Sequence, residues 1–293
     1  MTALGIDAGG SATRYVVVDA ANTVLASGAL APIDGHLFVP EHRARFEAVA
    51  AELAQATAGF APQSIVAGIT GLTGDAPEAR QAEAIFATAL GATAVRVEDD
   101  LWIGYHAAFA PGAGHVVYAG TGSVGLHIRA DGSLLRVGGR GILIDDGGSA
   151  FWIGREGLNA LYRRIDAGDP PGALGEALFA AIGGADWNTV RAHVYSGGRT
   201  AVAMLALAVA AAADDPAAAT ILAQAGRELA RLARDLVKRI GPLPVVLQGR
   251  AADLHPAILA SMRQEASGLD IAKHTADAAL AAAKLANQQG KRP

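Results

Sequence analysis

Short apolar runs and amphipathic stretches alternate along the chain in an order that occurs twice. Near the amino terminus, three short runs rich in Val, Leu and Ala are separated by turn residues, which predicts strands in hairpin succession. Longer stretches with apolar residues at helical spacing follow, with further strand-like runs between them. The elements expected in the first half are strands at 3–7, 14–19, 24–30, 64–70 and 93–98 and helices at 41–58 and 77–90.

The second half of the chain begins the same order again. Hairpin strands followed by alternating helices and strands are typical of a mixed sheet covered by helices. We therefore expect an α/β protein with two lobes. The elements expected here are strands at 115–119, 123–129, 133–137, 140–145 and 244–248, helices over most of 149–240, and helices at 255–266 and 275–288.

Length and composition agree with two globular lobes. A chain of 293 residues is long for a single core, and its 52% hydrophobic and 18% charged content argues against disorder. The net charge of −4 gives no basic footprint for nucleic acid or for an anionic membrane. The longest apolar run, Ala201 to Ala213, is too short for a bilayer and predicts a buried helix. We expect a cytoplasmic protein with small-molecule ligands, without a signal peptide.

The absence of cysteine restricts the possible chemistry. With no cysteine, disulfides, thiolate zinc sites and thiolate-bound iron–sulfur clusters are excluded, and a redox role is not expected. The eight histidines are scattered, and none has a neighbour at the His-Glu-x-x-His spacing. We expect most of them to be surface or core residues.

A glycine-rich turn follows the first predicted strand. Glycine has no Cβ and tolerates positive φ, so backbone N–H groups at such a turn can approach a phosphate closely. An aspartate there would face a metal-bound nucleotide. The same residue types also form ordinary hairpin turns, and that interpretation stays open. The residues concerned are Asp7, Gly9, Gly10, Ser11 and Thr13.

A second turn of this kind occurs more than a hundred residues later. Gly120, Thr121, Gly122 and Ser123 lie between two predicted strands, and two such hairpins facing each other would hold the phosphates of one nucleotide from both sides. Neither hairpin is a Walker loop, because the only Gly-Lys pair is Gly290-Lys291 in the tail. A Gly-x-Gly-x-x-Gly pattern after the first strand is also missing, which weakens a dinucleotide-binding interpretation.

Two acidic residues lie where a predicted strand ends and a helix begins. Asp99 and Asp100 could cap this helix and complement its dipole. Alternatively, one carboxylate could lie at the carboxyl end of the strand, which is the usual edge of a binding cleft. Both interpretations are possible from the pattern alone.

Three motifs together resemble a known family. The two glycine hairpins are similar to the phosphate loops of the actin, sugar kinase and heat-shock chaperone superfamily. The stretch from Gly138 to Glu156 resembles a signature of the N-acetylglucosamine and glucosamine kinases, in the group that contains the BadF/BadG/BcrA/BcrD-type ATPases. The resemblance implies a two-lobed, actin-like (ribonuclease H-like) fold with a mixed five-stranded sheet per lobe. The lobes expected are 1–112, completed by the C-terminal helix 275–289, and 113–274.

The resemblance also implies an activity and roles for single residues. It implies phosphorylation of an amino sugar, N-acetylglucosamine or glucosamine, at the 6-hydroxyl by ATP with Mg²⁺. Asp100 would be the general base, Asp99 would replace an asparagine of the relatives on the sugar side, and Asp7 would hold the metal. Nucleotide binding is implied for both hairpins and for Gly249, and sugar binding for Gly139, Arg140 and Asp146.

The chain departs from these relatives at several positions. Arg140 replaces a tryptophan, Gly147 a glutamate and Gln248 a glycine. Arg140 could form charged hydrogen bonds to the sugar or to Asp145 and Asp146. The turn ending at Ser149 could also do no more than cap the next helix.

Two other functions are compared with the kinase. ATPases of this group that activate dehydratases or reductases carry an iron–sulfur cluster, which a chain without cysteine cannot ligate. A sensor that binds nucleotide or sugar without catalysis would be favoured by loss of Asp100 or of the first hairpin, and both are present. The sequence leaves the identity of the sugar and a homodimer open.

Overall fold

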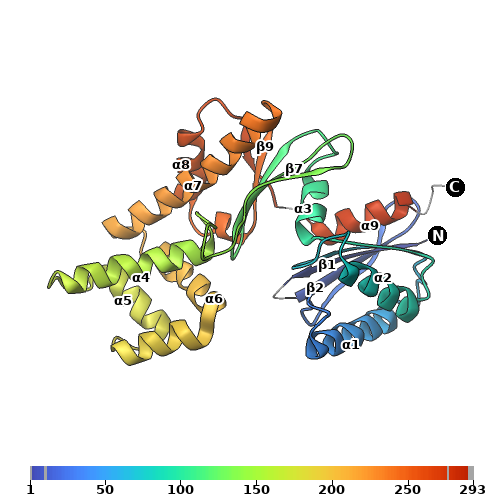
Figure 1. Cartoon of the computed structure of the whole chain (residues 1–293), viewed down its shortest axis with the longest axis horizontal. Helices are drawn as coiled ribbons and strands as arrows, with labels where there is room; N and C mark the ends of the chain where they lie inside the picture. The colour runs from blue at the N-terminus through green and yellow to red at the C-terminus, as the bar shows by residue number, and fades with distance from the viewer. Residues whose placement is uncertain (1, 10–11, 276, 290–293) are drawn as a thin grey trace. The chain divides into compact units, whose positions relative to one another are not determined.

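The computed structural model describes residues 2–9, 12–275 and 277–289. The chain divides into two compact units, Met1–Phe109 with Ala276–Pro293 (unit 1) and Ala110–Thr275 (unit 2). Each unit contains one five-stranded sheet with helices packed against it (Figure 1). The expected fold class, two mixed five-stranded sheets with flanking helices, is confirmed.

Unit 1 is built on a sheet with the strand order β3-β2-β1-β4-β5. The first three strands form successive antiparallel hairpins, and β4 and β5 run parallel to β1. The carboxyl ends of β1, β4 and β5 therefore lie at one edge of the sheet, where ligands bind in open α/β sheets. The strands are β1 (Ala3–Gly9), β2 (Ala12–Val18), β3 (Val24–Leu30), β4 (Ser64–Ile69) and β5 (Ala94–Glu98).

Alternate residues of β1 face two different helical layers. Leu4 and Ile6 belong to a core shared with α1 and α2, whereas Ala3 belongs to a core shared with α3 and α9. Because side chains alternate along a strand, Gly5 and Asp7 share the face of α3 and α9. Figure 1 shows α3 and α9 on one side of the sheet and α1 and α2 on the other. These helices are α1 (Pro40–Thr57), α2 (Pro77–Leu90), α3 (Asp100–Ala108) and α9 (Ala278–Gln289).

Unit 2 has a sheet with the corresponding order, β10-β9-β6-β7-β8. Again three strands form antiparallel hairpins, and two further strands run parallel to the first of them. Helix α7 covers the sheet with the buried stripe of Leu222, Leu229 and Leu236, whose spacing of seven places them on one helix face. The elements are β6 (His115–Ala119), β7 (Ser123–Ile128), β8 (Leu134–Gly138), α4 (Ala150–Asp166), α5 (Gly172–Ile182), α6 (Trp187–Ala211), α7 (Pro216–Ile240), β9 (Val245–Gln248), η1 (Arg250–Asp253), α8 (Pro256–Glu265) and β10 (Ile271–Lys273).

The predicted strand at 140–145 is wrong. This segment is a turn, in which the N–H groups of Ile144 and Asp145 both donate to the carbonyl of Gly141. Gly141 has a positive φ, which interrupts extended backbone, and Leu143 and Ile144 are 95% and 80% exposed. The apolar pattern of this segment therefore does not mark a buried strand. Strand β10, with three residues, was not expected because it is too short to show a period.

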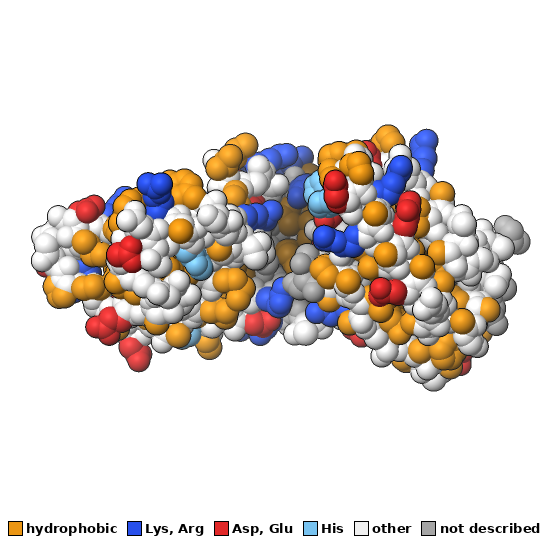
Figure 2. Space-filling view, turned by 90° about the horizontal axis from the view of Figure 1, so that it is seen from below, with side chains coloured by type: hydrophobic (Ala, Val, Ile, Leu, Met, Phe, Trp, Pro, Cys, Tyr) orange, Lys and Arg blue, Asp and Glu red, His pale blue; other side chains and the backbone are white. Residues whose placement is uncertain are grey.

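The helix expected around the Ala201 run is longer than the run itself. Within the described part of the chain, α6 alone is long and apolar enough to cross a membrane, judged by length and composition. Its backbone leaves the helical region at Gly198, and several of its side chains, such as Leu205 and Val209, pack into the core of unit 2. On the face shown in Figure 2, acidic and basic side chains are interspersed with apolar ones.

Candidate active site

The candidate site in unit 1 begins at the carboxyl end of β1. Asp7 pairs in register with Arg14 of β2 on one side and with Gly68 of β4 on the other. A Cβ at Gly68 would lie 2.5 Å from Ile103 Cγ1 and 3.1 Å from the Cα of Asp100. The missing side chain at Gly68 thus lets the first turn of α3 approach the sheet beside Asp7.

Asp99 and Asp100 have different environments at the start of α3. Asp99 is the N-cap, and its carboxylate accepts a hydrogen bond of 2.8 Å from the N–H of Leu101. Burial, the charge of Asp99, a hydrogen bond that protonated Asp100 donates to the Asp99 carboxylate, and the charge of Asp7 together raise the pKa of Asp100 to about 8. Capping therefore accounts for Asp99 but leaves Asp100 as a carboxyl group with the tuned pKa of a general acid or base.

Asp7 is the second carboxylate of this edge. Burial raises its pKa above the usual range, the Arg14 guanidinium at 3.8 Å opposes that rise, and Asp277 adds to it. Asp277 also caps α9 by accepting from the N–H of Leu280. Asp7 thus interacts electrostatically with both Asp100 and Asp277, and carboxylate oxygens are ligands that suit a hard divalent cation.

The other residues of the first hairpin differ in their burial and contacts. A Cβ at Gly9 would meet no described atom within 4 Å, so nothing within the described protein requires glycine there. Thr13 is fully buried and its hydroxyl donates to the carbonyl of Ala31, a structural role. Gly10 and Ser11, both expected to contact phosphate, lie outside the described residues.

In unit 2, the second glycine hairpin joins β6 to β7 and is held by the start of α4. The backbone N–H groups of Ala150 and Phe151 donate to the carbonyls of Gly120 and Thr121. Ser123 is buried, and its hydroxyl donates to the carbonyl of Gly147 at 2.7 Å. The hydroxyl of Ser123 is thus used internally, whereas Thr121 is exposed at the tip.

Asp146 lies directly against this hairpin. Its side chain is buried, its backbone has a positive φ of 65°, and its carboxylate is 3.9 Å from Arg199. A Cβ at Gly122 would lie 2.7 Å from Asp146 and 2.9 Å from Arg199. Burial raises the pKa of Asp146, and a hydrogen bond from the Ser123 N–H and the charge of Arg199 oppose this. The hairpin, Asp146 and Arg199 therefore form one cluster.

The other residues of the Gly138–Glu156 stretch that the sequence singled out have separate structural roles. Asp145 pairs with Arg231 at 3.1 Å, so the acidic pair takes its arginines from α6 and α7. Arg140, considered as a partner from sequence, is exposed at the start of the turn. Gly139 has a positive φ, and a Cβ there would press on Val124 of β7. Ser149 caps α4 through the N–H of Trp152, so the capping interpretation of this turn is correct for Ser149.

Gly249 follows β9 with a φ of 96°, and a Cβ there would be 2.3 Å from the carbonyl oxygen of Ala119. Close packing of β9 on β6 therefore explains this glycine without a ligand.

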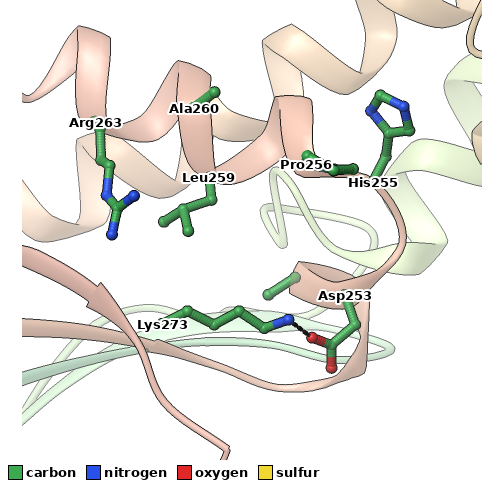
Figure 3. Close-up of a pocket in the computed structure, with 8 residues that line it drawn as sticks. Asp253, His255, Pro256, Leu259, Ala260, Arg263 and Lys273 are labelled. Atoms are coloured by element: carbon green, nitrogen blue, oxygen red, sulfur yellow. Dashed lines mark ion pairs between the residues drawn. The ribbon is translucent and has the colours of Figure 1, made fainter.

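A hollow of about 320 Å³ is lined by η1, which follows Gly249 in the chain, and by α8 and β10. Figure 3 shows Leu259 of α8 pointing across it toward Lys273, whose ammonium pairs with Asp253.

Two residues of these clusters were not identified from sequence. Arg199 lies far along the chain from Asp146, in α6. The helical pattern of the sequence does not show the kink at Gly198 that precedes it. No sequence signal distinguishes Asp277 within the closing helix expected at 275–288. A polar residue next to a glycine inside a long apolar helix was the one sequence signal for Arg199.

Comparisons with known proteins agree with this architecture. A model of the BadF/BadG/BcrA/BcrD ATPase family matches residues 4–283. The solved structure of a candidate N-acetylglucosamine kinase from Chromobacterium violaceum is 27% identical, covers 97% of this chain and 98% of its own, and has a TM-score of 0.75. A second such candidate, from Porphyromonas gingivalis, is 18% identical, covers 98% and 99%, and has a TM-score of 0.80.

A more distant likeness concerns the fold alone. A ROK family glucokinase from Streptomyces griseus, solved with glucose and AMPPNP, is 17% identical, covers 98% of this chain and 100% of its own, and has a TM-score of 0.62. No curated protein matches the sequence. Since the family model extends over nearly the whole chain, the protein belongs to the BadF/BadG/BcrA/BcrD ATPase family.

Proposed function

We propose that this protein transfers the γ-phosphoryl group of ATP to the 6-hydroxyl of an amino sugar, N-acetylglucosamine or glucosamine, with Asp100 as general base. The observation that carries the proposal is the Asp100 carboxyl, whose pKa is raised to about 8 beside Asp7 at the carboxyl edge of the sheet. The amino sugar is suggested by the likeness to two candidate N-acetylglucosamine kinases.

Asp100 has the properties that a general base for a hydroxyl needs. A raised pKa makes its carboxylate a stronger base than an exposed aspartate, and at neutral pH a fraction of it remains ionised. In the proposed step, the sugar hydroxyl gives its proton to Asp100 while its oxygen bonds to the γ-phosphorus. The bond between that phosphorus and the β,γ-bridging oxygen breaks, and ADP leaves.

The nucleotide side is assigned to the glycine hairpins. Backbone N–H groups at Gly9, Gly10 and Ser11, and at the hairpin of Gly120, Thr121, Gly122 and Ser123, are proposed to bind the phosphates. The hydroxyl of Thr13 donates to the carbonyl of Ala31, so Thr13 would stabilise the first hairpin rather than bind phosphate through its side chain. We place the adenosine on the side of Gly249, where the hollow in front of Leu259 offers apolar walls to a base.

Asp7 is the residue proposed to hold Mg²⁺. The fit rests on the oxygen donors of Asp7, because Mg²⁺ prefers carboxylates and water, and on the carboxyl groups of Asp100 and Asp277 that interact with Asp7. When bound, the ion neutralises phosphate charge. Arg14 would then exchange its contact with Asp7 for one with solvent or phosphate.

The sugar side is assigned to polar groups of both units. Asp99, Gly139, Arg140 and Asp146 are proposed to contact sugar hydroxyls or the N-acetyl group, as the resemblance implies. Buried hydrogen bonds discriminate strongly between hydroxyl arrangements. Because Asp146 lies against Gly122, it would also link sugar recognition to the second phosphate hairpin. Arg199 is proposed to stabilise charge that develops on the transferred phosphoryl group.

The test of this proposal is ADP release over a panel of sugars with ATP and Mg²⁺. We expect release that depends on an amino sugar and yields the 6-phosphate, identified by mass spectrometry and NMR. Asp100→Asn is expected to lose at least about a thousandfold in kcat while ATP still binds. ADP release that no sugar stimulates would contradict the proposal and favour an ATPase that acts on a protein partner.

A further inference from the structure

Two histidines and an aspartate converge in unit 1, on the segment that leads from β3 into α1. The Nδ1 atoms of His36 and His42 each lie 2.9 Å from Asp34 Oδ1, and His42 Nδ1 is also 2.9 Å from Oδ2. One ligand atom from each of these residues lies within 4.8 Å of the other two. The sequence did not reveal this group, because its members have no familiar metal-binding spacing.

The segment that carries these residues is fixed to the rest of unit 1. Ile33 and Leu37 are buried, and the N–H of Gly35 donates to the carbonyl of Thr70 at 3.0 Å. A Cβ at Gly71 would come within 3.3 Å of His36 Cε1, so the turn after β4 leaves the room that this imidazole occupies. The three side chains are thus held by separate anchors on one scaffold, a loop and the first turn of α1.

We propose that Asp34, His36 and His42 bind a divalent transition-metal ion of the zinc type. Two imidazole nitrogens and one carboxylate oxygen form a ligand set that Zn²⁺ accepts, with water completing the shell. Zinc bonds of about 2.0–2.2 Å place ligand atoms roughly 3.3 Å apart in a tetrahedron. The contacts of 2.9 Å therefore need to open by only a few tenths of an ångström.

The site is open to solvent, which allows an ion to enter. The side chains of His36, His42 and Asp34 are 50%, 37% and 26% exposed. The carboxylate of Asp34 supplies one negative charge, and deprotonated Nδ1 atoms would replace the present N–H contacts by bonds to the metal. A bound ion would connect the loop after β3 to α1, and its removal would leave an aspartate that accepts from one or both histidines.

The experiment titrates metal-free, full-length protein without a histidine tag. Co²⁺ is the optical probe, because its visible absorption reports tetrahedral nitrogen and oxygen ligation, and Zn²⁺ binding is measured by calorimetry and by displacement of Co²⁺. We expect one equivalent to bind with a Kd of about 1 µM or tighter. His42→Gln and Asp34→Asn should each weaken binding by about 100-fold or more, whereas His274→Gln in unit 2 should leave it unchanged.

Thermal unfolding in EDTA separates a lost site from a lost fold. Each variant should then have a Tm close to that of the metal-free parent. Zn²⁺ should raise the Tm of the parent and of His274→Gln, but not that of His42→Gln or Asp34→Asn. Absence of stoichiometric binding in the parent would overturn the proposal, since the group would then be only a hydrogen-bonded Asp–His arrangement. Binding that survives both His42→Gln and Asp34→Asn would overturn it as well. ADP release plays no part in these readouts, so the result is independent of the proposed kinase activity.

Discussion

At the scale of single residues, the acidic pair at the start of α3 shows how one backbone turn creates two different carboxyl groups. Asp99 has extended backbone and accepts from the helix, so its charge is satisfied locally. Asp100 is the first helical residue, and its side chain is withdrawn from water next to Asp99 and Asp7. Like charges close together in a poorly solvated place favour the protonated form of one of them. Asp100 is that residue.

This environment predicts the pH dependence of the proposed reaction. A base must be ionised to act, so kcat/KM should rise with pH and level off above an inflection near pH 8, the pKa of Asp100. Asp99→Asn removes a neighbouring charge and keeps an N-cap, since asparagine caps helices well. The inflection in that variant should move to lower pH by about one unit. An unchanged profile in Asp99→Asn would show that another group controls it.

The same pKa predicts a stability effect. The folded state holds the Asp100 proton up to about pH 8, whereas the unfolded chain releases it near pH 4, so the contribution of Asp100 to stability falls as pH rises between these values. Asp100→Asn cannot lose a proton and should be more stable than the parent at pH 8, by roughly 1 kcal/mol or more. Urea unfolding should show this gain at pH 8 and a smaller one at pH 5. A gain that grows toward low pH would contradict the assignment.

Gly9 offers a test of the first hairpin. A methyl group there meets no described protein atom within 4 Å, so Gly9→Ala should leave the Tm within about 1 °C of the parent. If phosphate approaches this backbone, the added methyl group should raise the KM for ATP about tenfold. Gly59→Ala, at another open position, is the matched control for both measurements. A KM for ATP that stays constant in Gly9→Ala would place the phosphates elsewhere.

At the scale of elements, two glycines decide how closely helices approach the sheet of unit 1. A Cβ at Gly5 would lie 2.1 Å from Ala279 O and from Ala283 N, so α9 can pack on β1 only because residue 5 has no side chain. Gly68 has the same effect on α3. The alanines of α9 extend this principle, since small side chains on both surfaces let a helix and a sheet come close.

The Gly68 contact predicts an effect on the proposed activity. Gly68→Ala should push the first turn of α3, and with it Asp100, away from Asp7, because the new methyl group would lie 2.5 Å from Ile103. A displacement of even about 1 Å at a reacting group lowers rates by roughly 10- to 100-fold. We expect kcat to fall by that factor, with the KM for ATP little changed. A kcat equal to that of the parent, in a variant that folds, would separate this contact from the site.

The sequence predicted most of these elements because their patterns are local. Strand β3 and helix α2 begin and end at the expected residues. For α2 the boundaries are marked in the sequence, because Pro77 lies in its first turn and Gly91 ends it with a positive φ. The strand expected at 140–145 failed for the opposite reason. Its apolar residues satisfy the strand pattern, but the positive φ of Gly141 turns the backbone and exposes them. Local hydrophobicity alone does not show which apolar side chains are buried against the rest of the protein.

At the scale of the whole molecule, the two sheets share one plan. In each, a hairpin joins the central strand to its antiparallel neighbour, β1 to β2 and β6 to β7, and the glycine motifs occupy these two corresponding hairpins. The sequence revealed this repetition, because the motifs have the same residue types in the same order relative to their strands. It did not reveal groups assembled from distant segments, such as Asp146 with Arg199, since no periodicity connects them.

The most direct test of the central claim is ADP release with and without amino sugar, measured for the parent and for Asp100→Asn under saturating ATP and Mg²⁺. We predict release that N-acetylglucosamine or glucosamine stimulates at least tenfold in the parent and that is lost in the variant, with nucleotide affinity preserved in both. Release that ignores every sugar, or sugar phosphorylation that persists in Asp100→Asn, would contradict it.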